Sequence, residues 1–578
     1  MNVRNAIANE IVERDGIHYL EGCGEFAYND GDQAEAYLLR AIRDAGDISS
    51  RSRELEARIK DWVSRYHFSR SRSLAYQSLE IPDSASVLEI GSGSGSITRL
   101  LGERAGSVLA IEGSARRAAM TRLRTRDQQN VAVLCAAFER VRFTQQFDII
   151  VCNGVLEYAS MFMSGNDAAE KMVGMFAQLL NPTGTLLVAI ENKFGLRYFS
   201  STREEHTGVA FDGLEGYARH PKGPKTFGRA ELEVLLRKSF AAVEFLLPLP
   251  DYKFPQAIAR ECLLREVDCS ELFASMGNCK SRTDFRPLMH ERLVWGQLGL
   301  NRQLAIFSNS FFVLAGHAPT LLLQPSWRGD VYAINRSPGL EVRTRIEINA
   351  DASVSTQKSY TGIAPTMPGP FRHRLETAGW VEGESVHTAI SRAMLAKTNA
   401  SLEDRLQPSV TQWWSAVIDR ERTCEEHAIS GAAVDLNWEN SILQAGQVRF
   451  IDSEWVVDHP MPANWFLYRT VSKFVDAEWN YRHRWDARWR NASKRRLLKA
   501  VGSLINVEFS LPTIWQSIRL EGEFQRFATD SSRRNLRVFI EDCTPFSWGY
   551  CWKEWRQRLG QFMGRVARNI HRLSPVRR

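Results

Sequence analysis

Three glycines separated by single serines follow a short apolar segment, and they are the first place in the sequence where chemistry can be expected. The segment reads Val87-Leu-Glu-Ile-Gly-Ser-Gly-Ser-Gly95. Glycines at 91, 93 and 95 let the backbone turn sharply and approach a ligand closely. Glu112 lies 21 residues after Gly91, at the end of the next apolar segment, where a carboxylate can accept hydrogen bonds from both hydroxyls of a ribose. The spacing predicts a site for a cofactor that contains adenosine.

The carboxylate of Glu89, inside the same segment, narrows the choice of cofactor. A pyrophosphate would favour the spacing GxGxxG, whereas this loop has GxGxG preceded by an acidic residue. A negative charge beside the loop favours a cationic ligand. S-adenosylmethionine, with its sulfonium and ammonium groups, fits this requirement, and a nicotinamide or flavin dinucleotide is the alternative.

Two further residues are expected near this cofactor. Phe138, in Ala136-Ala-Phe-Glu139 after the third apolar segment, either brackets the adenine or packs in the core. Asn153 directly follows the fourth apolar segment, where a polar residue is costly without a partner. The carboxyl ends of strands are where ligands sit in such sheets, so we expect Asn153 to bind the cofactor.

The elements that must position these residues alternate between strand and helix. Short apolar segments at 86–90, 107–111, 131–135, 148–152 and 185–190 are separated by helical stretches. This alternation predicts an α/β fold with a parallel, doubly wound, Rossmann-like sheet. Residues 1–80 have apolar positions spaced by three and four, around Leu55 and Trp62, and are predicted to be helical.

Eight segments between residues 60 and 260 carry a resemblance to a known family. They are Tyr66-His-Phe-Ser, Val87–Gly95, Glu112-Gly-Ser, Gly154-Val-Leu-Glu-Tyr, Ile190-Glu-Asn-Lys-Phe-Gly-Leu-Arg-Tyr, Glu205-His, Lys225-Thr-Phe-Gly-Arg and Pro250-Asp-Tyr-Lys-Phe-Pro. With these segments the region resembles class I S-adenosylmethionine-dependent methyltransferases, and more closely the group encoded with bacterial surface-polysaccharide (O-antigen, lipopolysaccharide) genes. The resemblance implies O-methylation of a sugar or a phosphate on a surface glycan or its lipid-linked precursor.

The polar segment after the fifth strand is expected to contact the acceptor. His206 stands beside two glutamates and is the candidate general base for a sugar hydroxyl, since histidine can take up a proton near neutral pH. The alternative is a loop histidine hydrogen-bonded to the backbone. Arg197, Lys225 and Arg229 either bind an anionic acceptor or are solvated loop charges.

A second set of chemically capable residues lies in the C-terminal half. Asp435 and Asn440 are five residues apart, and Asp452 follows an apolar segment 17 residues after Asp435. In a kinase, one aspartate takes the proton of the acceptor hydroxyl, while an asparagine and a second aspartate bind magnesium. Asp435 is therefore a candidate catalytic residue, Asn440 and Asp452 are candidate metal ligands, and Lys358 is a candidate phosphate-binding lysine.

This second set resembles the catalytic segments of protein-kinase-like and aminoglycoside-phosphotransferase-like folds, and the domain order resembles bifunctional kinase–methyltransferases that cap O-antigen chains. The resemblance implies ATP and Mg²⁺ as further cofactors. The pattern is incomplete, because Ala432-Ala-Val precedes the first aspartate and Ser453-Glu follows the second. A non-catalytic kinase-like module that binds the glycan or a partner enzyme is the alternative.

The composition shift along the chain supports several domains. Of the 16 tryptophans, 13 lie from Trp380 onward. We therefore predict an N-terminal helical region (1–80), a methyltransferase domain (81–265), a connecting α/β segment (266–320), a kinase-like α+β domain (321–475) and C-terminal helices (476–578).

The charge distribution and the cysteine content restrict the binding partners and the cellular location that can be expected. The 578-residue chain has a net charge of +7, and its last 28 residues hold eight Lys or Arg against one Glu. The remainder is neutral, so nucleic-acid binding is not expected. The tail from Cys551 to Arg578 is predicted to be a basic amphipathic helix, either on a membrane surface or packed on the body. Nine scattered cysteines and a polar N-terminus predict a cytoplasmic protein, peripheral to the inner membrane if the tail binds it.

Overall fold

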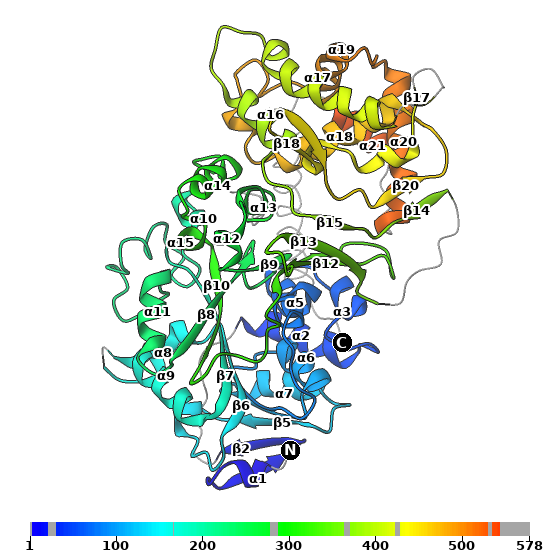
Figure 1. The fold of residues 1–578 in the computed structure, drawn as a ribbon. Helices are drawn as coiled ribbons and strands as arrows, with labels where there is room; N and C mark the ends of the chain where they lie inside the picture. Colours follow the sequence, from blue (N-terminus) through cyan, green and yellow to red (C-terminus); the bar gives the residue numbers. More distant parts are fainter. Residues whose placement is uncertain are drawn as a thin grey trace, which may run out of the picture. The chain divides into compact units, whose positions relative to one another are not determined.

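The computed structural model describes residues 3–20, 30–165, 167–277, 287–362, 370–421, 423, 428–529 and 535–543. The predicted basic helix at Cys551–Arg578 lies outside these residues. The chain divides into two compact units (Figure 1): residues 1–334, 342–359 and 377–380 form the first, and residues 335–341, 360–376 and 381–578 form the second.

The first unit is built on one mixed sheet, with fourteen strands in the described part of the chain. Their order is β1-β2-β5-β4-β3-β6-β7-β10-β8-β9-β11-β12-β13-β15. Their bounds are β1 Ile11–Arg14, β2 Ile17–Leu20, β3 Ser86–Ile90, β4 Ser107–Glu112, β5 Val131–Cys135, β6 Phe147–Asn153, β7 Leu180–Glu191, β8 Ala242–Leu249, β9 Ala257–Arg260, β10 Ser310–Gly316, β11 Trp327–Ala333, β12 Val342–Ile348, β13 Val354–Tyr360 and β15 Thr377–Gly379. Strands β3 to β7 pair in parallel, as the sequence predicts for the doubly wound part, and β2 adds a further parallel strand beside β5.

Helices cover both faces of this sheet, with α8, α9 and α11 on one side and α2, α5, α6 and α7 on the other (Figure 1). The α-helices of the first unit are α1 Val3–Ala6, α2 Asp32–Arg43, α3 Arg53–Ala57, α4 Trp62–Phe68, α5 Leu74–Gln77, α6 Ser96–Arg104, α7 Ala115–Arg124, α8 Ala159–Phe162, α9 Ala168–Leu179, α10 Leu196–Phe199, α11 Arg229–Arg237, α12 Leu263–Glu266, α13 Ser270–Met276, α14 Glu291–Leu300 and α15 Leu304–Phe307. Three short 3₁₀ helices are η1 Arg70–Ser73, η2 Phe138–Arg140 and η3 Leu156–Tyr158.

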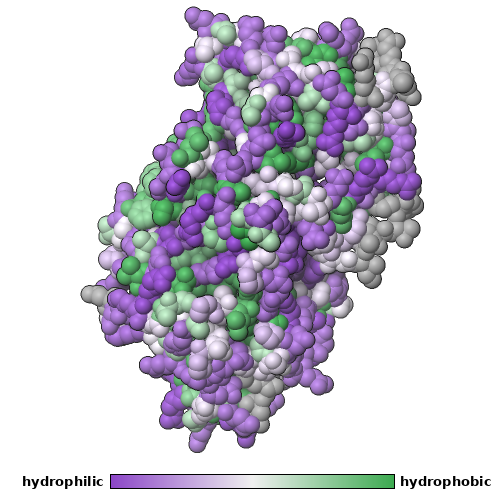
Figure 2. Space-filling view, viewed as in Figure 1, coloured by the Kyte–Doolittle hydropathy of each residue, from purple (hydrophilic) through white to green (hydrophobic). Residues whose placement is uncertain are grey.

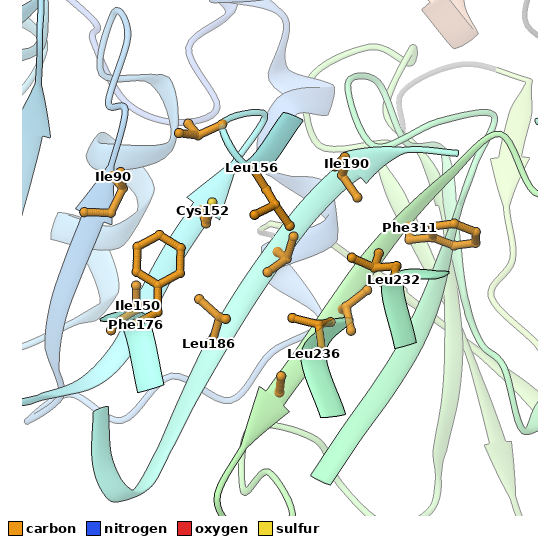
Figure 3. Packing of buried hydrophobic residues seen from close by; sticks show 14 of the residues in the cluster. Ile90, Ile150, Cys152, Leu156, Phe176, Leu186, Ile190, Leu232, Leu236 and Phe311 are labelled. Carbon is orange, nitrogen blue, oxygen red and sulfur yellow. The ribbon is translucent and has the colours of Figure 1, made fainter. Parts of the chain in front are cut away.

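Alternation along the strands decides which face each side chain joins, because successive residues of a strand point to opposite sides. In β7, Leu186 and Ile190 belong to the core that includes Phe176 of α9 and Leu232 of α11 (Figure 3). The intervening Leu187 and Ala189 belong to a separate core with α5 and α6 on the opposite face. The same alternation decides to which face of the sheet the polar residues at the strand ends point.

Two regions differ from the sequence-based expectations. Residues 11–20, expected to be helical, form the hairpin β1–β2, which pairs with β5 at the edge of the sheet. The turn is Asp15-Gly16 with φ of 53° and 72°, and Asp-Gly at two left-handed positions is a strong hairpin signal. The expected connecting segment 266–320 contributes β10, which lies between β7 and β8 and runs antiparallel to both.

The second unit contains six α-helices and three small sheets in its described part. The helices are α16 Val386–Leu395, α17 Leu402–Glu421, α18 Ala463–Ala477, α19 Lys494–Leu504, α20 Leu511–Thr529 and α21 Asn535–Cys543. The strands are β14 Phe371–His373, β16 Glu384–Ser385, β17 Ala428–Ile429, β18 Ser441–Gln444, β19 Gln447–Phe450, β20 Trp455–Val457 and β21 Met461–Pro462, and the 3₁₀ helices are η4 Gly431–Asp435, η5 Trp438–Asn440 and η6 Arg482–Arg484. Its core is rich in tryptophan, including Trp413, Trp438, Trp455, Trp465, Trp485 and Trp489.

The division into units does not follow the expected domain 321–475. Strands β11, β12 and β13 extend the sheet of the first unit, so Lys358 on β13 belongs to a different unit from Asp435. Among the described residues, no helix is both long and apolar enough to cross a membrane. On the face drawn in Figure 2, hydrophilic residues are spread over both units and alternate with smaller hydrophobic groups.

Candidate active site

The glycine loop lies at the point where the direction of strand order reverses. Strand β3 has β4 on one side and β6 on the other, and ligands of doubly wound sheets sit at the carboxyl ends of strands at such a point. Gly91, Gly93 and Gly95 all have positive φ, at 76°, 58° and 79°. A Cβ on Gly91 would lie 2.6 Å from Val155 Cγ2, so the segment after β6 passes directly over the loop.

Glu112 holds the glycine loop at the carboxyl end of β4. We call the region at the carboxyl ends of β3, β4 and β6 the crevice, after the place that ligands occupy in such sheets. Its Oε2 accepts a hydrogen bond of 2.8 Å from the N–H of Gly93, and its Oε1 accepts one of 3.0 Å from the N–H of Ser114. Burial raises the pKa of this carboxyl group. Each carboxylate oxygen has a second lone pair, so the two ribose hydroxyls can still be accepted. The predicted ribose contact therefore fits this geometry.

Glu89 and Asn153 point to the same face of the sheet, as their strand parity requires. Thr98 Oγ1 of α6 donates to Glu89 Oε2 at 2.5 Å, and Tyr76 Oη of α5 donates to Asn153 Oδ1 at 3.2 Å. Burial raises the pKa of Glu89 to about 7, which the bond from Thr98 partly opposes. The two predicted cofactor residues thus lie at the ends of neighbouring strands.

Phe138 has the geometry of a packing residue. It is buried and makes ring contacts with Phe162 and Phe176. Its neighbour Glu139 is more suited to a ligand, because Glu139 Oε2 is buried and has no hydrogen-bond partner among the described residues. A carboxylate there can accept a hydrogen bond from an exocyclic amine of adenine.

Arg72 is a candidate ligand-binding residue that sequence reasoning missed. Its guanidinium lies 4.0 Å from the ring centroid of Tyr66, and the residue is 6% exposed. Its Nε and Nη1 are buried and have no hydrogen-bond partner in the described part of the chain. The charge of Arg72 lowers the pKa values of Tyr76 and Glu89, although burial outweighs it at both. A buried cation with two unused donors beside this crevice is suited to a carboxylate.

His67 connects the N-terminal helices to the loop. Its Nδ1 lies 2.8 Å from Ser94 Oγ and its Nε2 lies 3.1 Å from Asp30 Oδ2. Arg117 donates to the same Asp30 oxygen at 2.7 Å. Burial lowers the pKa of His67, so it is neutral near pH 7. Its role is to hold the serine between Gly93 and Gly95 in place.

A buried group of charged side chains lies beside the crevice, and we call it the acid–base cluster. Its members are Glu157, Glu191, Arg197, Glu205, His206, Asp251 and Lys253. A Cβ on Gly154 would lie 2.9 Å from Tyr252 Oη and 3.6 Å from Glu157 Oε1, which places the cluster next to the carboxyl end of β6. Five of the eight segments that carry the family resemblance contribute to it or contact it.

Ion pairs link most of the cluster. Lys253 Nζ donates to Glu191 Oε1 and to Glu205 Oε2 in short contacts. Arg197 donates to Asp251 Oδ2 at 3.0 Å and, again in a short contact, to Glu205 Oε1. Arg197 is therefore engaged inside the protein and is not available to bind an anionic acceptor.

His206 joins the cluster with both ring nitrogens. Nδ1 lies 3.1 Å from Tyr158 Oη, and Nε2 lies 3.6 Å from Glu191 Oε2. Although burial lowers the pKa of His206, Glu191 and Glu157 raise it to about 9. Burial and the charge of Glu191 raise the pKa of Glu157 to about 8, whereas Lys253 and His206 hold the pKa of Glu191 well below its usual value despite burial. The side chain of His206 thus contacts other side chains and not the backbone. With a pKa of about 9, it carries a proton near neutral pH.

The other predicted acceptor contacts lie outside the cluster. Arg229 is paired with Glu233 and Glu261. Lys225 is exposed, and its main-chain N–H donates to the carbonyl of Glu157 at 2.8 Å. Only Lys225 keeps the position of a loop charge that an acceptor could reach.

In the second unit, Asn440 connects the segments that contain Asp435 and Asp452. The side-chain amide of Asn440 donates to the main-chain oxygens of Asp435 and Asp452, at 3.0 and 3.3 Å. Asp435 is buried, and its Oδ2 accepts from the N–H groups of Glu454 and Trp455 at 3.2 and 2.8 Å. Its Oδ1 lies 3.8 Å from Arg469. This arrangement favours a structural role for Asp435 over accepting a substrate proton.

Comparison with known proteins agrees with the geometry of the crevice. Residues 88–188 match a family described as a methyltransferase domain. This part of the chain is a methyltransferase domain. The match begins in β3 and ends in β7, so it contains the glycine loop, Glu112 and Asn153. It stops before Glu191, so most of the acid–base cluster lies beyond it.

Solved structures similar to the chain include the following three. N-methyltransferase NodS from Bradyrhizobium japonicum WM9, in complex with S-adenosyl-L-homocysteine, is 15% identical over 37% of this chain and 89% of its own, with a TM-score of 0.24. Phosphoethanolamine N-methyltransferase 2 from Haemonchus contortus is 14% identical over 43% and 53%, with a TM-score of 0.25. YcgJ from Bacillus subtilis is 15% identical over 43% and 99%, with a TM-score of 0.25. No curated protein matches the sequence.

Proposed function

We propose that the chain is an S-adenosylmethionine-dependent methyltransferase that modifies a bacterial surface glycan or its lipid-linked precursor. The observation that carries this proposal is the crevice between the carboxyl ends of β3 and β6. It combines a glycine loop in left-handed conformation, the carboxylate of Glu112 and the unused donors of Arg72. No dinucleotide pyrophosphate is favoured there, because Glu89 adds a second buried carboxylate.

Each part of the cofactor has a matching group in this crevice. Glu112 would accept the ribose hydroxyls, and Glu139 Oε2 would accept the adenine amine. Arg72 would bind the α-carboxylate through its free N–H groups, while Glu89 favours the cationic end. When bound, S-adenosylmethionine supplies an electrophilic methyl group, and the protein contributes alignment and control of protons.

The acceptor class rests on the segments that build the acid–base cluster. These segments are the ones that resemble the surface-polysaccharide group of methyltransferases. A sugar hydroxyl loses a proton on methylation, and a phosphate acceptor does not. We assign that proton to the cluster at the ends of β6 and β7, of which His206 is one member. His206→Ala is expected to reduce turnover and to leave cofactor affinity unchanged, and full activity would remove His206 from the mechanism.

For the second unit we propose a kinase-like module, and the state of Asp435 favours the non-catalytic alternative. The bridge from Asn440 to Asp435 and Asp452 supports the kinase-like arrangement. The buried carboxylate of Asp435 does not support phosphoryl transfer. ATP and Mg²⁺ binding that is lost in Asp452→Ala would establish a nucleotide site, and turnover of ATP to a phosphorylated glycan would restore the bifunctional alternative.

Calorimetry of the full chain with S-adenosylmethionine tests the principal proposal. Glu112→Gln is expected to weaken binding by roughly tenfold or more, because a hydrogen bond to a charged group contributes about 1.5–3 kcal/mol. Glu170→Gln, an exposed carboxylate on α9, is the control and should bind as the wild type does. Binding of a nicotinamide dinucleotide in place of S-adenosylmethionine would contradict the proposal. Transfer of a labelled methyl group to fractionated cell-envelope glycans then identifies the acceptor.

A further inference from the structure

Three buried atoms of the carboxylates and the imidazole in the acid–base cluster have no hydrogen-bond partner among the described residues. They are Glu157 Oε2, Glu191 Oε2 and His206 Nε2. One ligand atom from each of these residues lies within 4.8 Å of the others. Buried polar atoms without partners are rare in folded proteins, and an ion is one of the few explanations for them.

In two of these side chains the other polar atom is already bound, and the two remaining atoms, Glu191 Oε2 and His206 Nε2, lie 3.6 Å apart. Glu191 Oε1 is bound by Lys253, and His206 Nδ1 is bound by Tyr158. The contact between Tyr158 and Nδ1 orients the imidazole ring, as the hydrogen-bond partners of metal-bound histidines do. Glu157 is carried by η3 directly after β6, and Glu191 ends β7, so both glutamates come from a rigid part of the sheet.

The charge of the cluster can accommodate a cation when its ligands are in their metal-binding forms. Its carboxylates are Glu157, Glu191, Glu205 and Asp251, and its permanent cations are Lys253 and Arg197. When an ion displaces the protons of Glu157 and His206, the side chains carry a net charge of −2, which one divalent cation offsets. Glu204 lies beside the cluster, and its Oε2 accepts the N–H groups of His206 and Thr207, at 2.8 and 2.6 Å.

We propose that Glu157, Glu191 and His206 bind one divalent transition-metal ion of the Mn²⁺ or Zn²⁺ type. A ligand set of two carboxylates and one imidazole suits these ions better than Mg²⁺ or Ca²⁺, which prefer oxygen alone. Three protein ligands leave positions open, as in catalytic rather than structural sites. The ion would lower the pKa of an acceptor hydroxyl bound there, so that the hydroxyl could release its proton to water as its oxygen takes up the methyl group. His206 is then a ligand and not a base.

This inference concerns the site of the proposed function, but ion binding is measured without cofactor or acceptor, so the two can fail separately. The untagged full chain is stripped with a chelator and titrated with Mn²⁺, followed by electron paramagnetic resonance, and with Zn²⁺, followed by calorimetry. An Asp452→Asn background removes the ion site predicted in the second unit. We expect one ion per chain.

Matched variants decide the location of the ion. Glu157→Gln and His206→Gln should each weaken binding by at least about tenfold, and Glu170→Gln should not. Pulsed resonance of bound Mn²⁺ should show a directly bound nitrogen that His206→Gln removes, a readout that a merely structural role would not move. Circular dichroism checks that each variant is folded, and the nitrogen signal of the wild type remains decisive if one is not.

Three results would overturn the proposal. One is the absence of binding by the wild type at millimolar Mn²⁺ and Zn²⁺. Another is ion binding that survives both variants. The third is a loss of S-adenosylmethionine affinity in Glu157→Gln with no ion bound by the wild type, which would mean that the carboxylates serve the cationic end of the cofactor.

Discussion

The two units each gather acidic side chains beside an arginine, but they leave them in opposite states. In the second unit, Asp435 accepts two main-chain N–H groups and lies beside Arg469. In the first unit, the acid–base cluster and Arg72 keep buried atoms without partners in the described part of the chain. Satisfied buried polar groups stabilise a fold, whereas unsatisfied ones reduce stability and are kept where a ligand will satisfy them. The comparison therefore separates a structural carboxylate from a binding site, although residue types alone do not.

The largest expected effect is a loss of stability, and it tests the structural role of Asp435. Asp435→Ala leaves the N–H groups of Glu454 and Trp455 without their acceptor, while Arg469 keeps its ion pair with Glu521, so the unfolding free energy of the second unit should fall by about 2–5 kcal/mol. Denaturant unfolding followed by tryptophan fluorescence measures this, since that unit has a tryptophan-rich core. Asp458→Ala, which breaks an exposed pair with Arg372, should cost at most about 1 kcal/mol. Equal, small effects of both variants would mean that Asp435 is free for catalysis.

The glycine loop gives the next largest effect. Gly95 has φ of 79°, and a Cβ there would lie 2.8 Å from Thr121 Cα. Gly95→Ala should cost about 1–2 kcal/mol for the left-handed conformation alone, and more for the clash with backbone, and cofactor binding should be lost with it. Gly174→Ala in α9, where a Cβ meets nothing within 4 Å, should stabilise the unit by about 0.5–1 kcal/mol. Thermal unfolding of the pair measures the difference.

Arg72 tests the binding side of the comparison. Arg72→Met removes a buried cation whose donors Nε and Nη1 have no partner in the described chain, so stability should change little or rise. Affinity for S-adenosylmethionine should fall by about tenfold or more, the effect of losing a charged hydrogen bond. Arg40→Met, at an exposed position of α2, is the control for calorimetry and unfolding. A large loss of stability without a loss of affinity would assign Arg72 a structural role.

The smallest expected effect is a pH dependence from Glu89. Its pKa of about 7 means that the carboxyl group is neutral below that pH and negative above it. A cationic cofactor binds the negative form better, so affinity should rise as pH increases from 6 to 8 and then level off. Glu89→Gln should remove this rise, and the difference between the two curves excludes the cofactor's own titration. A wild-type affinity that falls over the same range would place Glu89 away from the cationic end.

Local signals predicted much of the first unit. The strands from Ser86 to Glu191 and the glycine loop follow from apolar segments, turn residues and spacing, all of which act over short distances. The hairpin at Asp15-Gly16 has an equally local signal in its Asp-Gly turn, although residues 1–80 were predicted to be helical from their periodicity. Strand β10 lies in the predicted connecting α/β segment, but its place between β7 and β8 depends on pairing with residues more than 60 positions away, which periodicity does not encode.

The same limit applies to the candidate site. Glu112 could be predicted because its distance from the glycine loop is fixed by one strand–helix–strand unit. Asp251 meets Arg197, and Lys253 meets Glu191, only through the folded sheet, so the spacing in the sequence does not predict these contacts. Arg72 is one of 74 Lys and Arg residues, and only its burial without partners distinguishes it. Asp435 shows the converse. Its motif can be recognised in the sequence, but the motif does not indicate whether the carboxylate is already hydrogen-bonded within the protein.

The position of β10 has a consequence for the order in which the protein is made. Strands β7 and β8 do not pair with each other, and each forms its ladder with β10. A nascent chain that has emerged only as far as residue 265 would therefore expose two unpaired, apolar strand edges. Residues 310–316 must leave the ribosome before β10 can pair with these two edges. The protein therefore most needs a chaperone while residues 266–316 are being translated.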